Sequence, residues 1–385
     1  MSVKSPQSFD EIALADSAAA WGAAVDGLAT WYSGALRRGA TAPELMGDWL
    51  RWWASTTERR LPVWSSAHEV VFEAPVARLR DFSDGSRSRV LPALVLPPQA
   101  GHDSCIVDYS PQQSQMRTIR EAGLERAYAL DWIGATPSTK HATIDDYLAA
   151  IERAVDHIGG PVNLIGDCQG GWLATIYAAL RPEHVNTLTI AGAPVDFHAG
   201  EPVIHAALQS LAPGGNLAFY RGLVAAGGGM LGGEQMLAGF IAINPENEIA
   251  RQMQLLANLD DHAHVERYRE FEDWFKHTQA IPGGFYLWIV EHLFRDNELI
   301  AGELEVRGEH VDLARIACPL NLLAGAADHI TPPDQVWALA DYTSTPAADT
   351  ERRLASGGHL GLFMGHEALR EHWPPLLAAV HARSV

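Results

Sequence analysis

The sequence predicts an α/β protein built on a mostly parallel β-sheet with helices on both faces. Short apolar runs with strand character stand at residues 68–82, 90–98, 104–109, 126–132, 161–167, 187–194, 318–330 and 350–363. Helical patterns lie between the later runs, at residues 144–158 and 171–181. Strands that alternate with helices are typical of a parallel sheet, because each helical crossover returns the next strand in the same direction.

A helical hairpin is predicted before this alternation, over residues 1–65. Its first helix covers residues 8–38, where Ser8 and Glu11 have the spacing of a capping box. Apolar residues follow at helical spacing, namely Trp21, Val25, Leu28, Tyr32 and Leu36. A second helix is expected to start near Pro43, since proline suits the first turn. It carries Trp49, Trp52 and Trp53, which either dock the hairpin on a core or grip an apolar polymer or partner.

The alternation stops after Pro194, and residues 198–285 are rich in Gly, Met and aromatic residues. We interpret residues 198–285 as a helical cap inserted over one end of the sheet, with the glycine-rich residues 225–233 as a loop. The α/β core is then expected in two parts, residues 66–197 and 286–385.

The composition excludes several classes of function. The formal charge is −19, from 28 basic and 47 acidic residues, which disfavours binding to nucleic acid and to anionic membranes. We find no apolar run long enough for a transmembrane segment and no apolar core of a secretory signal in the first residues. We therefore expect a cytoplasmic protein.

The three cysteines, Cys105, Cys168 and Cys318, are too few and too dispersed for a disulfide framework, and they fit a reducing compartment. Cys105 and Cys318 stand in apolar runs, where we expect them to pack. The sequence has no HExxH pattern, and "DHAH" at 261–264 is more typical of a solvated loop than of a ligand set. We expect neither a metal nor a bound cofactor.

One turn carries a pattern with chemical meaning. In "NLIGDCQGGW", residues 163–172, an apolar strand runs through Gly166-Asp167-Cys168-Gln169-Gly170 into a helix. The pattern strand, G-x-nucleophile-x-G, helix is the nucleophile elbow of α/β-hydrolases. A nucleophile there lies at a helix N-terminus, where the helix dipole favours a thiolate.

The remaining members of a catalytic triad follow in the order that this fold requires, nucleophile, acid, base. Asp328 follows a buried strand, and His359 follows the last strand within "SGGHLG". We predict the triad Cys168, His359 and Asp328. His359 would take the thiol proton, and Asp328 would orient the imidazole and stabilise its charged form. His329 is the alternative base, although it fits better as a neighbour of the acid.

Other residues are expected around this triad. The oxyanion hole needs the backbone N–H of Gln169 and a second donor from the loop at 97–104, with Gly101 and His102 as candidates. We expect His329 and three tryptophans to contact substrate, namely Trp172, Trp274 and Trp288. Aromatic residues between 271 and 288 could line an acyl channel, or they could form the small core of the cap.

The chain resembles the polyhydroxyalkanoate synthase superfamily over residues 66–385. This superfamily also contains intracellular polyhydroxybutyrate depolymerases and a synthetase-like family of unknown function. The stretches that are similar are "LIGDCQGGW" (164–172), "ALDWIGATPSTKHATIDDYL" (129–148), "AGAPVDF" (191–197), residues 285–320, "DHITPPDQ" (328–335) and "GGHLGLF" (357–363). By this resemblance Cys168, Asp328 and His359 match the catalytic positions of the family.

The resemblance implies an acyltransferase that moves (R)-3-hydroxyacyl groups through a covalent acyl-cysteine. Its substrates would be a hydroxyacyl-coenzyme A thioester and a polyhydroxyalkanoate polymer or oligomer, with a partner subunit or a homodimer expected. The resemblance also implies a location on polyhydroxyalkanoate granules. The alternatives are a depolymerase or esterase that uses the same triad, and a non-catalytic granule-associated protein.

Two details separate the members of the superfamily. Synthases usually carry an Asn-Pro stretch where this chain has "LPPQAGHDS" (96–104), which looks more like the depolymerases and the uncharacterised family. The depolymerases usually lack the second glycine after the nucleophile, which is present here as Gly171. Together with "NPEN" (244–247), "CQGGW" favours the uncharacterised family.

Overall fold

The computed structural model describes residues 9–200, 203–243 and 245–385, with side chains from residue 21 onward. Ser8 of the expected capping box and Asn244 of "NPEN" lie outside the described residues. The described chain forms two compact units. The helical unit contains the residues up to Pro62 together with Glu234–Thr278, and the core unit contains Val63–Gly233 together with Gln279–Val385.

The core unit is built on one eight-stranded sheet with the order β1-β2-β6-β3-β7-β8-β13-β14. These strands are β1 (Glu69–Glu73), β2 (Ala77–Asp81), β3 (Ala93–Leu96), β6 (Ala127–Trp132), β7 (Val162–Asp167), β8 (Val185–Ala191), β13 (Leu320–Gly325) and β14 (Thr350–Ala355). The pairs β1–β2 and β2–β6 are antiparallel, and every other pair is parallel. This is the sheet of the α/β-hydrolase fold, so the predicted fold class is confirmed.

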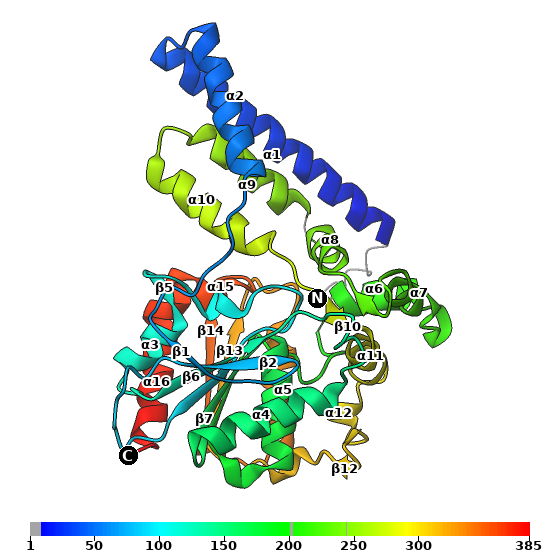
Figure 1. Cartoon of the computed structure of the whole chain (residues 1–385). Helices are drawn as coiled ribbons and strands as arrows, with labels where there is room; N and C mark the ends of the chain where they lie inside the picture. The colour runs from blue at the N-terminus through cyan, green and yellow to red at the C-terminus, as the bar shows by residue number, and fades with distance from the viewer. Residues whose placement is uncertain (1–8, 201–202, 244) are drawn as a thin grey trace, which may run out of the picture. The chain divides into compact units, whose positions relative to one another are not determined.

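Helices cover both faces of this sheet, as Figure 1 shows. On one side α3 (Gln115–Glu121) contacts α16 (Trp373–Ala382), and on the other α4 (Ile144–Ile158) contacts α5 (Gln169–Leu180). Every residue of β3, β6, β7 and β13 is buried. The near-continuous apolar character of these strands in the sequence therefore follows from burial on two faces.

Helix α4 shows how local sequence sets the bounds of an element. The side chain of Asp146 accepts hydrogen bonds from the backbone N–H of Thr143, at 2.7 Å, and from its hydroxyl, which makes a capping box. The helix ends at Gly159, whose φ of 89° is a left-handed conformation that glycine adopts without strain.

One expected strand is wrong. Residues Ser104–Val107 form a turn of 3₁₀ helix, followed by the short hairpin of β4 (Asp108–Ser110) and β5 (Gln113–Ser114). The Oδ1 atom of Asp103 accepts a hydrogen bond from the backbone N–H of Cys105 at 2.9 Å. This local side-chain bond competes with strand pairing, and an apolar pattern does not reveal it.

The described residues of the expected cap, 198–285, are divided between the two units. In the core unit, α6 (Val203–Leu211) and α7 (Ala218–Ala226) pack around Val290 in an apolar cluster. The glycine-rich segment 225–233 is not only a loop, because β9 (Met230–Leu231) pairs with β10 (Ile281–Pro282). The smaller elements that remain in this unit are α11 (Gly283–Trp288), α12 (Glu298–Ala301), β11 (Glu305–Val306), β12 (Glu309–His310), α13 (Pro333–Trp337), α14 (Leu339–Tyr342) and α15 (Gly361–Met364).

The helical unit joins the N-terminal hairpin to the rest of the expected cap. Its helices are α1 (Phe9–Arg38), α2 (Ala42–Thr57), α8 (Gly233–Ile243), α9 (Pro245–Ala257) and α10 (His262–Phe275). Helix α1 lies against α9 at very short range, because a Cβ atom on Gly27 would collide with Met253. The indole N–H of Trp52 donates to the backbone oxygen of Gln252 at 2.9 Å, which ties α2 to the same helix.

The apolar residues that identify α1 in the sequence do not form its packed face. Trp21, Val25, Leu28, Tyr32 and Leu36 are all exposed, with Trp21 at 74%. Gly27 approaches α9 instead, and Ala35 is buried. In α2 only Trp52 fully takes the expected docking role, since Trp53 is 62% exposed. In the described ranges, no helix is both long enough and apolar enough to cross a membrane.

The contact at Gly27 gives a matched pair of substitutions. Gly22→Ala should raise the free energy of unfolding by up to about 1 kcal/mol, because alanine favours a helix and nothing lies near this position. Gly27→Ala makes the same chemical change but should lower the free energy of unfolding by about 1–3 kcal/mol, because the methyl group meets Met253. Urea denaturation followed by circular dichroism measures both. Equal effects of the two substitutions would show that α1 does not pack on α9 at Gly27.

Candidate active site

The turn between β7 and α5 is a nucleophile elbow. Cys168 has φ 50° and ψ −120°, a left-handed conformation that is rare for a residue with a side chain. Its backbone N–H donates to the oxygen of Ala191 in β8 at 2.9 Å, and its own oxygen accepts from Gly171 at 2.9 Å. The thiol is half-buried, so a reagent can reach it at the sharp end of the turn.

Three glycines make this turn sterically possible. A Cβ atom on Gly166 would lie 2.5 Å from the backbone oxygen of Gly170, and one on Gly170 would collide with the backbone oxygen of Leu96. One on Gly171 would collide with the side chain of Ala193. The glycines that the sequence shows around Cys168 are therefore required by close backbone approach, as the pattern predicts.

The expected acid and base meet beside the elbow. The Nδ1–H of His359 donates to Oδ2 of Asp328 at 2.7 Å, and both side chains are almost completely buried. The other oxygen of Asp328 accepts from the backbone N–H groups of Ile330 and Thr331, each at 2.9 Å. These bonds fix the carboxylate, which in turn fixes the orientation of the imidazole.

The charge state of His359 follows from its partners. Burial alone lowers the pKa of this imidazole, but the charge of Asp328, the thiol of Cys168 and the hydrogen bonds to both outweigh burial. The net pKa of His359 is raised well above its usual value. His359 therefore carries a positive charge beside the sulfur of Cys168.

His329, the alternative base, is exposed, and the imidazole that donates to Asp328 is that of His359.

The two other cysteines differ from Cys168 in their surroundings. Burial raises the pKa of the Cys105 thiol well above its usual value, and it raises the pKa of Cys318 to about 11. Both thiols are therefore poor nucleophiles at neutral pH.

The loop after β3 reaches the elbow, as an oxyanion hole requires. A Cβ atom on Gly170 would also lie 2.7 Å from the backbone oxygen of Pro97, so this loop lies against the first turn of α5. Gln169 is the first residue of α5, and its backbone N–H therefore has no acceptor within the helix. Further along the loop, Gly101 has φ 77° and its oxygen accepts from the backbone N–H of Gln279 at 2.8 Å. His102 follows, with Nδ1 3.2 Å from the oxygen of Ala100.

The structure brings two of the three expected tryptophans together. The rings of Trp172 and Trp288 lie 6.2 Å apart, and the ring of Trp172 lies 6.1 Å from that of Phe285. Trp172 is only 1% exposed, so it belongs to an aromatic core. Trp274 is in the helical unit, where its ring lies near Phe271. Contact of these tryptophans with substrate stays a prediction.

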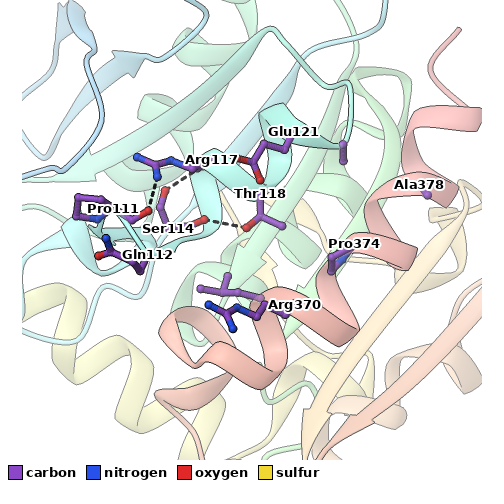
Figure 2. Close-up of a pocket in the computed structure, with 11 residues that line it drawn as sticks. Pro111, Gln112, Ser114, Arg117, Thr118, Glu121, Arg370, Pro374 and Ala378 are labelled. Atoms are coloured by element: carbon purple, nitrogen blue, oxygen red, sulfur yellow. Dashed lines mark hydrogen bonds between the residues drawn. The ribbon is translucent and has the colours of Figure 1, made fainter. Parts of the chain in front are cut away.

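Other candidate sites lie away from the elbow. Figure 2 shows a surface pocket between α3 and the C-terminal helices, with Arg117, Thr118, Arg370 and Pro374 in its lining. None of the expected site residues lines this pocket. In the "DHAH" stretch, Asp261 caps α10 by accepting from the backbone N–H groups of Ala263 and His264. The described residues contain no group of His, Cys, Asp or Glu side chains placed to bind a metal ion.

Sequence reasoning missed two polar residues directly behind the elbow. Asp167, the last residue of β7, and Gln115, the first residue of α3, are both completely buried. The Nε2–H of Gln115 donates to Oδ1 of Asp167 at 3.2 Å. An acidic residue at the end of a mostly apolar strand is the signal that the sequence offers, and its partner Gln115 is distant in the sequence.

Comparison with known proteins identifies the family of the chain. A family model described as "Protein of unknown function (DUF3141)" matches residues 78–381. The chain belongs to this family.

Several relatives are poly(3-hydroxyalkanoate) polymerase subunits, the class of protein that the motifs resemble. The poly(3-hydroxyalkanoate) polymerase subunit PhaC of Haloferax mediterranei is 27% identical over 326 residues, which are 83% of this chain and 64% of that protein. PhaC of Allochromatium vinosum is 27% identical over 278 residues, which are 70% of this chain and 75% of that protein. The predicted resemblance to polyhydroxyalkanoate synthases is therefore confirmed, although this chain spans less than two thirds of the Haloferax protein. Among solved structures, the monoacylglycerol lipase of Paleococcus ferrophilus aligns with a TM-score of 0.49 and 19% identity, over 77% of this chain and 97% of that one.

The two candidate bases, His359 and His329, should differ in their effect on the alkylation rate of Cys168, because His359 lies beside the thiol. At about pH 6 an ordinary thiol, with a pKa near 8.5, reacts slowly with iodoacetamide. His359→Gln removes the imidazolium and should slow alkylation of Cys168 at this pH by about tenfold or more. His329→Gln should change the rate by less than about twofold, because its side chain is exposed. Peptide mass spectrometry measures the rate, and a larger effect of His329→Gln would contradict the assignment of the base.

Proposed function

We propose that this protein is a polyhydroxyalkanoate synthase-like acyltransferase that moves (R)-3-hydroxyacyl groups through a covalent acyl-cysteine at Cys168. The observation that carries the proposal is the strained half-buried thiol of Cys168 beside His359, which is itself bonded to Asp328. The polymerase subunits among the relatives support the substrate class.

In the first step the thiolate of Cys168 attacks the carbonyl carbon of a hydroxyacyl-coenzyme A thioester, after His359 has taken the thiol proton. The N–H of Gln169 and a donor from the loop at 97–104 stabilise the oxyanion that forms. The carbon–sulfur bond to coenzyme A then breaks, and the imidazolium of His359 protonates the leaving thiolate. Coenzyme A is a substrate here, and the proposal includes no bound cofactor.

In the second step a hydroxyl group of another hydroxyacyl unit attacks the acyl-cysteine. His359 takes the hydroxyl proton and returns it to the sulfur of Cys168 as the thioester bond breaks, so an ester forms and the thiol is regenerated. Cysteine suits this chemistry because a thioester is exchanged for a thioester with little loss of free energy. An acyl-serine ester would be a less reactive donor.

The same residues could pass the acyl group to water, which is the reaction of a depolymerase or esterase. The loop "LPPQAGHDS" (96–104) favours this second candidate, because it departs from the synthase pattern beside the oxyanion hole. Which acceptor attacks depends on how well the closed site excludes water. A polymer or oligomer is the expected macromolecular substrate of either reaction, and the granule surface in the cytoplasm is the expected location. A partner subunit or homodimer remains part of the synthase proposal.

Product analysis tests the proposal and separates the candidates. Purified protein is incubated with (R)-3-hydroxybutyryl-coenzyme A, and released coenzyme A, oligomer and free hydroxyacid are measured. A synthase gives oligomer as the main product, and a thioesterase gives free acid. Hydrolysis of short hydroxybutyrate oligomers without any use of the thioester would identify a depolymerase and contradict the acyltransferase proposal.

Cysteine variants provide the matched control. Cys168→Ala should reduce release of coenzyme A by at least about 10³-fold, as expected when a nucleophile is removed. Cys318→Ala should retain most of the activity, because this thiol has a raised pKa and lies two residues before β13, at the other end of that strand from Asp328. Loss of activity in folded Cys318→Ala with retention in Cys168→Ala would overturn the choice of nucleophile.

A further inference from the structure

Asp167 occupies an unusual position for a carboxyl group. It ends β7, immediately before Cys168, and it is completely buried. In the described structure, the one hydrogen bond that its side chain accepts comes from the neutral amide of Gln115, at 3.2 Å from Oδ1. Within the described ranges, its Oδ2 atom has no hydrogen-bond partner.

Among the residues that the structure describes, no arginine or lysine forms a hydrogen bond or an ion pair with Asp167. Gln115 on α3 is uncharged. On the same segment as Asp167, the neighbouring titratable group is the thiol of Cys168. From the other described elements, His359 is the one charged group that acts on Asp167. Asp131, another buried acid, differs in this respect, because Arg80 donates two hydrogen bonds to its Oδ2 at 2.9 and 2.6 Å. A buried carboxylate without such a partner is strongly disfavoured.

Burial raises the pKa of Asp167 to about 8, and the hydrogen bond from Gln115 and the charge of His359 offset only part of this effect. The unpaired atoms agree with a bound proton. A proton on Oδ2 of Asp167 makes this atom a hydrogen-bond donor. The Oε1 atom of Gln115 is a buried acceptor, and it has no hydrogen-bond partner among the described residues.

We propose that Asp167 is held as a neutral acid behind the nucleophile and acts as a positioning residue that keeps a second negative charge away from Cys168 and His359. The inference rests on the proposed function in so far as it assigns chemistry to Cys168. The neutral form leaves Asp328 as the carboxylate that His359 faces. Loss of the proton from Asp167 places an uncompensated negative charge one residue from the sulfur.

That charge would oppose every anionic species at the elbow. It would disfavour the thiolate, and it would disfavour the oxyanion of the tetrahedral intermediate. We therefore expect the electrostatic potential at Cys168 to become more negative as the pH rises through about 8, with Asp167 as the group that titrates.

Alkylation of Cys168 with two reagents measures this potential directly. Iodoacetate is an anion and iodoacetamide is neutral, and both react with the same thiolate, so the ratio of their rates does not depend on how much thiolate is present. The experiment uses the full chain with Cys105→Ala and Cys318→Ala, which leaves one cysteine. Between pH 6.5 and 9.5 the iodoacetate-to-iodoacetamide ratio should fall by on the order of fivefold, with a midpoint near 8.

Asp167→Asn in the same background should remove this fall, because the amide is neutral at every pH. A fall at higher pH caused by loss of the imidazolium of His359 would be common to both proteins. The inference is wrong if the ratio in the parent protein is constant over this range, or if Asp167→Asn shows the same fall with the same midpoint. A role in packing alone would not give a pH-dependent difference between the two proteins.

Stability provides a second readout that needs no reactive cysteine. The folded state binds a proton on Asp167 that the unfolded chain, with a pKa near 3.8 for this group, releases. This contribution is fully present below about pH 4 and is lost as the pH rises toward the folded-state pKa near 8. Asp167→Asn removes the dependence, so its urea midpoint relative to the parent protein should increase steadily from pH 4.5 to pH 8.

Asp131→Asn is the matched control, because it also neutralises a buried acid but removes the carboxylate to which Arg80 donates. It should lower the urea midpoint at neutral pH. If Asp167→Asn also lowers the midpoint by a similar amount at every pH, Asp167 is an ionised, paired residue and the inference fails. If both readouts behave as expected but no thioester is consumed, the neutral acid is confirmed and the proposed function is the part that is wrong.

Discussion

The backbone conformation of Cys168 is the constraint on which the candidate site depends. A left-handed residue with a side chain is strained, and it persists only where the surrounding structure holds it. Here β7 and β8 hold the strand side of the turn through the bond from Cys168 to Ala191, and close contacts at Gly170 and Gly171 hold the helix side. The turn holds the thiol of Cys168 within interaction distance of His359. The positions of β7, β13 and β14 in the sheet bring the acid and the base to the same edge.

The two buried acids near this edge show how environment sets chemical role. Asp328 accepts hydrogen bonds from two backbone N–H groups and from the imidazole of His359. Asp167 receives one amide, and burial keeps it protonated. Asp328 is proposed to orient and stabilise the imidazolium of His359, and Asp167 is proposed to keep a second negative charge away from the nucleophile. The acid and base assignments of the site thus follow from hydrogen-bond partners rather than from residue type.

Much of this arrangement could be predicted from the sequence, because it follows from the alternation of strand and helix patterns and from the order of residues along the chain. Apolar runs between helical patterns predicted the parallel sheet. The strand ends that precede Cys168, Asp328 and His359 predicted the proposed triad. Three features could not be predicted in this way. The 3₁₀ turn at Ser104–Val107 depends on a side-chain bond from Asp103, and the packed face of α1 depends on how closely Gly27 lets α9 approach. The state of Asp167 depends on a partner 52 positions away.

The central claim is that an acyl group resides on Cys168 during turnover. The most direct test is to mix the protein rapidly with (R)-3-hydroxybutyryl-coenzyme A, quench in acid, and locate the added mass by peptide mass spectrometry. The account predicts a hydroxybutyryl thioester on the peptide that contains Cys168, removable by hydroxylamine and absent in Cys168→Ala. Consumption of the thioester with no adduct on Cys168 at any quench time, or an adduct on another residue, would contradict it.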